Sequence, residues 1–410
     1  MTAQSPTFPA PGTLATEARM ISTIGAAHFL SHFYFLLLPP VFLAVRAEYD
    51  VTYTQLGLAI AVFNIVSAIF QTPAGLLADR VGPFAVLVAG LALEGVAFIL
   101  IGVVHSYWFL VAMFAVAGLA NTVFHPCDYA LLSHHIGDQR VGRAFSFHTF
   151  SGMFGSAAAP VTMLFLEGLI GWRGAFIAAG TAGVVVTLLL ALQHRDYVEG
   201  PHLAARTMAK DGERVSKWDL LTSGPILRNF AFFTLLSATA AGIQNYSIVA
   251  LHDLFGFEAD VANNALSTNL LLSSIGVLAG GVLVSRVSNH NLVAAIGIGV
   301  AGLAVLAIGI SNLNVAMLFV IMAVGGFASG VIMPSRDMIV RQVTPPGFFG
   351  TVFGFVTTGF NVSGVIFPLI FGALMDHGSP RMVFIVSALC SLAAIVTVIG
   401  GKKRKAAVAA

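Results

Sequence analysis

Residues 54–104 read TQLGLAIAVFNIVSAIFQTPAGLLADRVGPFAVLVAGLALEGVAFILIGVV, two long apolar runs joined by the short segment GLLADRVG at positions 75–82. Each run has about the 20 residues that a helix needs to cross the hydrocarbon core of a bilayer. A helix satisfies its backbone hydrogen bonds internally, which a lipid environment requires. The stretch therefore predicts two consecutive transmembrane helices with a tight turn between them.

The composition of the whole chain favours a membrane protein. Hydrophobic residues make up 57% of the 410 residues and charged residues 9%, whereas soluble domains carry roughly 25% charged residues. The mean hydropathy is +0.90. A net charge of +2 gives no reason to expect nucleic-acid binding. The outer surface of the fold is therefore expected to contact a lipid bilayer.

The chain shows no signature of a bound cofactor or metal. Its two cysteines, Cys127 and Cys390, lie in separate apolar segments, which argues against a disulfide framework or a cysteine-built metal site. It contains no Gly-x-x-x-x-Gly-Lys-Ser/Thr phosphate loop and no His-Glu-x-x-His zinc helix. We therefore predict no cofactor and an energy source other than ATP.

Twelve runs are long enough to span a bilayer, which predicts an all-α membrane protein. Continuous apolar runs argue against a β-barrel, whose strands would alternate over about ten residues. The runs cover residues 20–45, 54–78, 84–104, 107–133, 143–168, 173–193, 226–251, 261–285, 291–311, 314–340, 348–375 and 381–400.

The positions of Lys and Arg predict the orientation, because cytoplasmic loops are enriched in them. With the N-terminus inside, sixteen Lys and Arg residues fall on the cytoplasmic side, and only Arg46, Arg173 and Arg381 fall outside. We expect a multi-pass protein of a bacterial-type inner membrane with both termini in the cytoplasm. The predicted cytoplasmic segments are a flexible tail at 1–18, a central loop at 194–224 and a basic tail at 401–410.

The two halves of the sequence repeat each other with a shift of 208 residues. The shift aligns seven pairs over roughly 60 residues without a gap: Gly118/Gly326, Pro126/Pro334, Gly142/Gly350, Phe145/Phe353, Pro160/Pro368, Arg173/Arg381 and Phe176/Phe384. This predicts two six-helix bundles, at 19–193 and 225–400, related by pseudo-symmetry. Transporters that move one bundle against the other around a central site have this plan.

The segment Gly75-Leu-Leu-Ala-Asp79-Arg80-Val-Gly82 resembles the signature between helices two and three of the major facilitator superfamily. Together with the twelve spans and the repeat, the resemblance covers the whole chain. It implies the major facilitator fold and transport of a small molecule by alternating access. At a finer level, the chain resembles the fosmidomycin-resistance branch of drug exporters in Ser31-His32, Gln55-x-Gly57-Leu58, Gln71-x-Pro73-x-Gly75 and Val123-Phe124-His125-Pro126.

The signature loop and one cross-repeat pair are candidates for gating. Gly75 and Gly82 allow a short turn and close helix approach. Asp79 and Arg80 can pair with a neighbouring helix end; a static loop contact is the alternative. The repeat equates positions 128 and 336, so we also expect Asp128 and Arg336 to form an inner gate in one state.

Ionisable residues inside predicted spans are candidates for proton coupling, because such groups are costly in lipid. Asp128 and His125 lie one turn apart on one helix and could share a proton. Glu94 is the carboxylate nearest the middle of a span, and His32 lies on the first helix, which commonly lines the cavity in this superfamily. For each residue, a purely structural role is the alternative.

Other polar residues within the spans are candidates for the substrate cavity. They are His28 and His32 on the first helix, Asn64 and Gln71 on the second, Asn121 on the fourth, Gln244, Asn245 and Tyr246 after a predicted break at Gly242, Asn269 on the eighth, and Thr358 and Asn361 on the eleventh.

These features predict a proton-coupled secondary active transporter that works as a monomer, binds a small molecule and protons, and exports a drug or toxic compound by antiport. One alternative is a proton-symport importer of a small organic anion. Another is a membrane-embedded enzyme or a sensor on a transporter scaffold, although duplicated halves favour transport and no enzymatic activity is expected.

Overall fold

The computed structural model describes residues 14–197, 217–345 and 349–399, and the regular elements in these ranges are helices. The predicted basic tail at 401–410 lies outside the described residues. So do most of the tail predicted at 1–18 and most of the loop predicted at 194–224.

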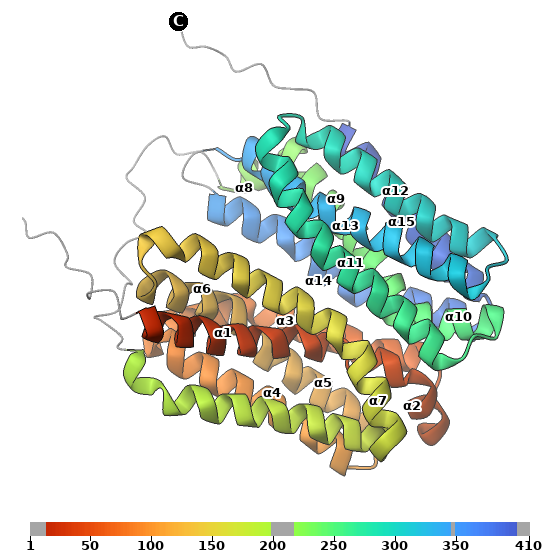
Figure 1. Ribbon diagram of the computed structural model, residues 1–410, viewed down its shortest axis with the longest axis horizontal. Coiled ribbons are helices and arrows are strands. Elements are labelled where there is room, and N and C mark those ends of the chain that lie inside the picture. The colour runs from red at the N-terminus through yellow and green to blue at the C-terminus, as the bar shows by residue number, and fades with distance from the viewer. Residues whose placement is uncertain (1–13, 198–216, 346–348, 400–410) are drawn as a thin grey trace, which may run out of the picture. The chain divides into compact units, whose positions relative to one another are not determined.

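Helices follow one another through the described chain (Figure 1). They are α1 (Leu14–Phe35), η1 (Pro39–Val41), α2 (Phe42–Tyr49), α3 (Tyr53–Val81), α4 (Pro83–Val103), α5 (Tyr107–Asn121), α6 (Phe124–His135), α7 (Asp138–Leu192), η2 (His194–Asp196), α8 (Lys217–Leu221), α9 (Gly224–Ala241), η3 (Gly242–Tyr246), α10 (Ser247–Phe255), α11 (Ala259–Arg286), α12 (His290–Ile310), α13 (Val315–Val343), α14 (Phe349–Asp376) and α15 (Pro380–Ile399).

Eleven helical stretches among the described residues are long and apolar enough to cross a membrane. One of them, Arg143–Leu192, has 50 residues, more than twice what one crossing needs. It breaks at Gly171, whose φ of 72° is non-helical. Dividing it there gives the twelve predicted spans and confirms the predicted boundary between the fifth and the sixth.

Three predicted spans are interrupted among the described residues: between α1 and α2, between α5 and α6, and between α9 and α10. α1 ends at Phe35, and the chain passes through a short 3-10 turn at Pro39 and Pro40 before α2. Proline cannot donate a backbone hydrogen bond, which explains the interruption. The predicted break at Gly242 is a π-helical turn, Gly242–Tyr246, between α9 and α10. Such turns are frequently found at functional sites.

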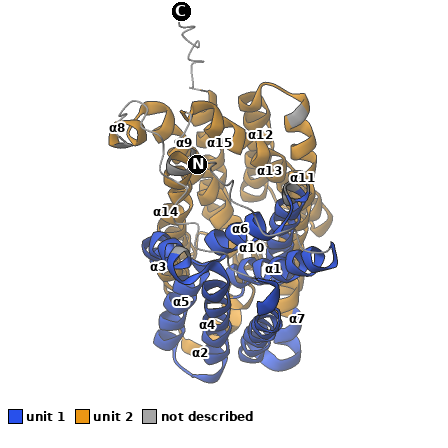
Figure 2. Ribbon diagram, turned by 90° about the vertical axis from the view of Figure 1, so that its left-hand side faces the viewer, with its two compact units in different colours: residues 1–37, 65–159, 165–208 blue, residues 38–64, 160–164, 209–410 orange. Residues whose placement is uncertain are grey.

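The chain divides into two compact units, shown in Figure 2. Unit 1 comprises Met1–Leu37, Ile65–Ala159 and Phe165–Met208, and unit 2 comprises Leu38–Asn64, Pro160–Leu164 and Ala209–Ala410. The predicted bundles at 19–193 and 225–400 describe the sequence repeat. The units differ from them because short pieces of the first half pack within unit 2.

The repeat reappears as equivalent contacts within each unit. Arg173 donates from Nη1 to the carbonyls of Ile101 (3.5 Å) and Val104 (3.2 Å). Arg381 donates from Nη1 to the carbonyl of Gly309 at 3.2 Å. The shift of 208 residues that equates the two arginines also equates positions 101 and 309. Each arginine thus fastens its own helix to the end of α4 or α12.

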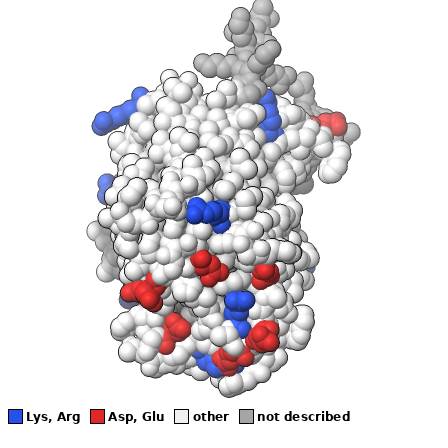
Figure 3. Space-filling view, turned by 90° about the vertical axis from the view of Figure 1, so that its right-hand side faces the viewer, with Lys and Arg blue, Asp and Glu red and all other residues white. Residues whose placement is uncertain are grey.

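Large apolar side chains cover much of the surface. Leu192, Val396 and Phe165 are 78%, 71% and 64% exposed, and the charged side chains on the face drawn in Figure 3 gather mainly in its lower half. In water such a surface would promote association. In a bilayer it contacts acyl chains.

Within unit 2, the carboxylate of Asp376 caps the start of α3. It accepts hydrogen bonds from the backbone N–H groups of Tyr53 (2.7 Å) and Thr54 (2.8 Å) and from the Thr54 hydroxyl (2.6 Å). The first N–H groups of a helix have no partner in the helix itself, and the helix dipole favours a negative charge there. Asp376, at the last residue of α14, therefore joins α14 to a segment more than 300 residues away in sequence.

Replacing Asp376 with Asn should weaken this connection. Asparagine keeps one acceptor oxygen but loses the charge and the second acceptor, so we expect a loss of about 1–2 kcal/mol and a melting temperature lower by a few degrees in a thermal unfolding assay. Asp260→Asn, an exposed acid in the first turn of α11, is the matched control. An unchanged melting temperature for Asp376→Asn would show that the cap contributes nothing.

Candidate functional site

The buried carboxylate of Asp128, on α6 in unit 1, contacts two buried histidines from other helices. Nε2 of His148, on α7, lies 2.9 Å from Oδ2 of Asp128 at hydrogen-bond geometry. Nδ1 of His28, on α1, lies 3.4 Å from the same oxygen. All three side chains are at most 3% exposed. The structure thus gathers one acid and two histidines from three helices inside the bundle.

A glycine allows this convergence. A Cβ on Gly152, one turn after His148, would lie 2.7 Å from two ring atoms of His28 and 2.8 Å from His32. The absence of a side chain there lets α7 approach α1, so that the His28 and His148 rings stack with centroids 3.6 Å apart. Small residues commonly permit such close approach between membrane helices.

Two further histidines extend the cluster toward the surface of the unit. The His32 and His125 rings lie 4.7 Å and 5.2 Å from that of His28. His32 is half-buried and His125 is exposed. Histidine can accept or release a proton near neutral pH. His125, His28 and Asp128 therefore form a series of titratable groups from the surface to a buried carboxylate.

The cluster fits a hydrogen-bonded group better than a metal centre. His28, Asp128 and His148 each offer one possible ligand atom, and these three atoms lie within 4.8 Å of one another. Bonds of about 2.1 Å to a tetrahedral metal would place such atoms about 3.4 Å apart. The 2.9 Å separation of His148 and Asp128 is instead that of a hydrogen bond, and only the 3.4 Å between His28 and Asp128 matches the metal value.

Glu94 is fully buried on α4, as expected for a mid-span carboxylate. Its Oε1 accepts a hydrogen bond from Nδ2 of Asn121, on α5, at 3.1 Å. Asn121, a candidate for the cavity, is half-buried. Among the described contacts, none links this pair to the histidines, so Glu94 forms a separate buried polar group.

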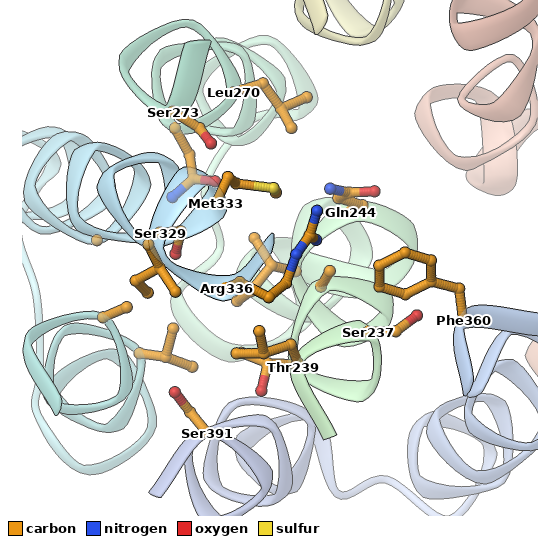
Figure 4. A pocket seen from close by; sticks show the side chains of 18 residues that line it. Ser237, Thr239, Gln244, Leu270, Ser273, Ser329, Met333, Arg336, Phe360 and Ser391 are labelled. Atoms are coloured by element: carbon orange, nitrogen blue, oxygen red, sulfur yellow. The ribbon is translucent and has the colours of Figure 1, made fainter. Parts of the chain in front are cut away.

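Unit 2 contains a cavity of about 220 Å³. Arg336, on α13, extends among the side chains that line it (Figure 4). It is the only charged residue of that lining in the described chain. The polar residues lining the cavity are Ser237, Thr239, Gln244, Asn269, Ser273, Ser329, Arg336 and Ser391.

The structure places only part of the predicted cavity set at this pocket. Of that set, Gln244 and Asn269 line it, together with Arg336, which the sequence had predicted as a gate residue. Tyr246 is fully buried, and its hydroxyl donates to the carbonyl of Pro368 at 2.6 Å. The remaining candidates do not line this cavity; they are His28, His32, Asn64, Gln71, Asn121, Asn245, Thr358 and Asn361.

The gating segment forms the expected tight turn between α3 and α4. Gly82 has a φ of 106°, a conformation that favours glycine. A Cβ on Gly75 would lie 3.9 Å from Pro126 of α6, and Arg80 is exposed. The side chain of Asp79 lies outside the described residues. The gating roles of these residues and of Arg336 stay predictions.

Sequence reasoning missed two kinds of residue. It did not select His148 as the partner of Asp128, although Gly152 and Gly155 follow it on one helix face and indicate close packing. It also did not select the serines of the pocket. Serine is common in membrane helices, so serine alone gives no signal of a site.

Comparisons with known proteins agree with this architecture. The family profile described as Major Facilitator Superfamily matches residues 24–235 and 230–408. A probable sulfoacetate transporter from Cupriavidus necator is 28% identical over 86% of each chain. The fosmidomycin resistance protein of Escherichia coli is 22% identical over 93% of each chain.

Solved structures show the same fold. A bacterial homologue of the human lysosomal transporter Spinster, in an inward-facing and occupied conformation, matches with a TM-score of 0.76 at 12% identity. The match covers 95% of this chain and 96% of that one.

Proposed function

This chain belongs to the Major Facilitator Superfamily, and on that premise we propose that it is a proton-coupled secondary active transporter of a small organic molecule. We propose further that it exports a drug or toxic compound by antiport from a bacterial-type inner membrane, with both termini in the cytoplasm. The similarity to the fosmidomycin resistance protein supports export.

The observation that carries the proposal is the contact of Asp128 with His28 and His148 inside unit 1. Ionisable groups within membrane helices commonly mark proton pathways. Oδ1 of Asp128 and Nδ1 of His148 have no hydrogen-bond partner among the described residues, so both atoms can accept a further hydrogen-bonding group. Exposed His125 connects the group to the surface of the unit.

Proton-symport import of a small organic anion is the second candidate. The cationic pocket around Arg336 favours it, as does the similarity to a probable sulfoacetate transporter.

Proteoliposomes with an imposed pH gradient test coupling and direction together. We expect labelled fosmidomycin or sulfoacetate to accumulate when the interior is acidic, because antiport exchanges interior protons for external substrate. Accumulation only with an acidic exterior would indicate symport instead. Absence of flux with either gradient and either compound would contradict the proposal and favour an enzyme or a sensor. Protein-free liposomes are the control.

A further inference from the structure

We propose that the cavity inside unit 2 binds a small organic anion, with a carboxylate, sulfonate or phosphonate group held by the guanidinium of Arg336. The inference rests on the proposed transport function and names the class of substrate. Both candidate directions of transport are compatible with it.

The size of the cavity argues for a small ligand. Its volume of about 220 Å³ is below the roughly 300–1,000 Å³ typical of sites for drug-sized molecules. A short organic acid fits this volume.

The charge of the cavity argues for an anion. Arg336 is the only charged residue among those that line it in the described chain. Its Nε donates to Asp337 at 2.9 Å, and the Asp337 side chain is 46% exposed, against 14% for Arg336. The described residues give the two Nη atoms of Arg336 no hydrogen-bond partner. These two donors can bind an oxyanion in the paired geometry that arginine favours.

Aromatic rings hold the guanidinium in place. Its Cζ lies 4.7 Å from the ring centre of Phe233 and 5.4 Å from that of Phe360. The ring faces stabilise the positive charge electrostatically and do not occupy the N–H donors. The donors therefore stay available, and little ordering is required when a ligand binds.

Neutral donors complete the site. The side chains of Ser237, Gln244, Ser273 and Ser329 have no hydrogen-bond partner among the described residues, and Figure 4 shows them around Arg336. By contrast, the side chains of Thr239, Asn269 and Ser391 donate to backbone carbonyls. The first set is free to bind a ligand, whereas the second set fastens helices together.

Equilibrium binding to the purified full-length protein in nanodiscs of zwitterionic lipid tests the inference without any proton gradient. The probes are sulfoacetate, malonate and phosphonoacetate, with neutral malonamide and cationic choline for comparison. We expect at least one of the anions to bind about tenfold or more tightly than malonamide and choline, because hydrogen bonds to charged groups are the stronger ones.

Arg336→Gln should weaken binding of that anion by about tenfold or more. Arg336→Lys should restore part of the affinity, because lysine keeps the charge but loses the paired donors. Arg341→Gln, an exposed arginine on the same helix, is the matched control and should bind as the wild type does. The double variant Ser273→Ala, Ser329→Ala keeps Arg336 and should lower affinity severalfold even if Arg336→Gln fails to fold.

The inference is overturned if none of the three anions binds the wild type, if malonamide binds as tightly as they do, or if Arg336→Gln keeps full affinity. Binding that disappears only when anionic lipid is added would identify a lipid headgroup as a competitor for the site. Anion binding without gradient-driven flux would leave this inference standing and reject proton coupling. Gradient-driven flux without anion binding would support proton coupling and reject this inference.

Discussion

Asp128→Asn is expected to abolish gradient-driven uptake in proteoliposomes while substrate exchange at equal pH continues. Asparagine has nearly the shape of aspartate and can still accept a hydrogen bond from His148, so the packing of α1, α6 and α7 should survive. It cannot bind or release a proton. On the proposed mechanism the buried carboxylate carries the proton, so we expect the gradient-driven rate to fall to the background of protein-free liposomes.

Two further variants test whether the effect is specific to Asp128. Glu94→Gln neutralises the other buried carboxylate, which contacts Asn121 and not the histidines, and should keep most of the gradient-driven rate. Asp260→Asn removes an exposed carboxylate and serves as the neutral control. Gradient-driven uptake that persists in Asp128→Asn but is lost in Glu94→Gln would reject Asp128 and assign coupling to Glu94.

Gly330→Ala is expected to cause a large loss of stability. A Cβ at this position of α13 would lie 1.9 Å from the carbonyl oxygen of Ser273 and 2.8 Å from its carbonyl carbon. Both are backbone atoms of α11, so no side-chain rotation can relieve the overlap. The two helices must separate, at a cost of about 1–3 kcal/mol or more.

The matched control is Gly281→Ala on α11, where a Cβ would have no atom within 4 Å. Alanine has the higher helix propensity, so this variant should melt at the same temperature as the wild type or slightly above it. Gly330→Ala should melt several degrees lower or fail to accumulate in the membrane. Equal melting temperatures for the two variants would show that α11 and α13 are less closely packed than the structure indicates.

The sequence predicted the fold well because the bilayer imposes simple rules on it. Spans follow from apolar length, and the predicted gap between 168 and 173 coincides with the break at Gly171. The repeat was visible because Arg173 and Arg381 perform the same local task in each half. The comparisons confirm both the superfamily and the resemblance to the fosmidomycin resistance protein.

The candidate site was predicted less completely. Helical spacing along one helix paired Asp128 with His125, but the structure gives Asp128 a hydrogen bond to His148 and a contact with His28. Asp128 and His148 are 20 residues apart on different helices, and no periodicity connects them. Likewise, the sequence singled out Arg336 only as a gate residue that the repeat equates with Asp128, and it gave no indication that Arg336 lines a cavity with unpaired serines.

The amino-acid sequence by itself determined that this chain forms membrane helices, how many there are and that its halves are related. These properties follow from residues close together in the chain and from the cost of exposing polar backbone to lipid. Only the tertiary structure decided which polar groups meet: Asp128 with two histidines in unit 1, Asp376 with the start of α3, and Arg336 with a cavity in unit 2. These contacts depend on which helix faces pack together. In lipid, that packing is determined by the fit of small residues such as Gly152 and Gly330 rather than by hydrophobicity.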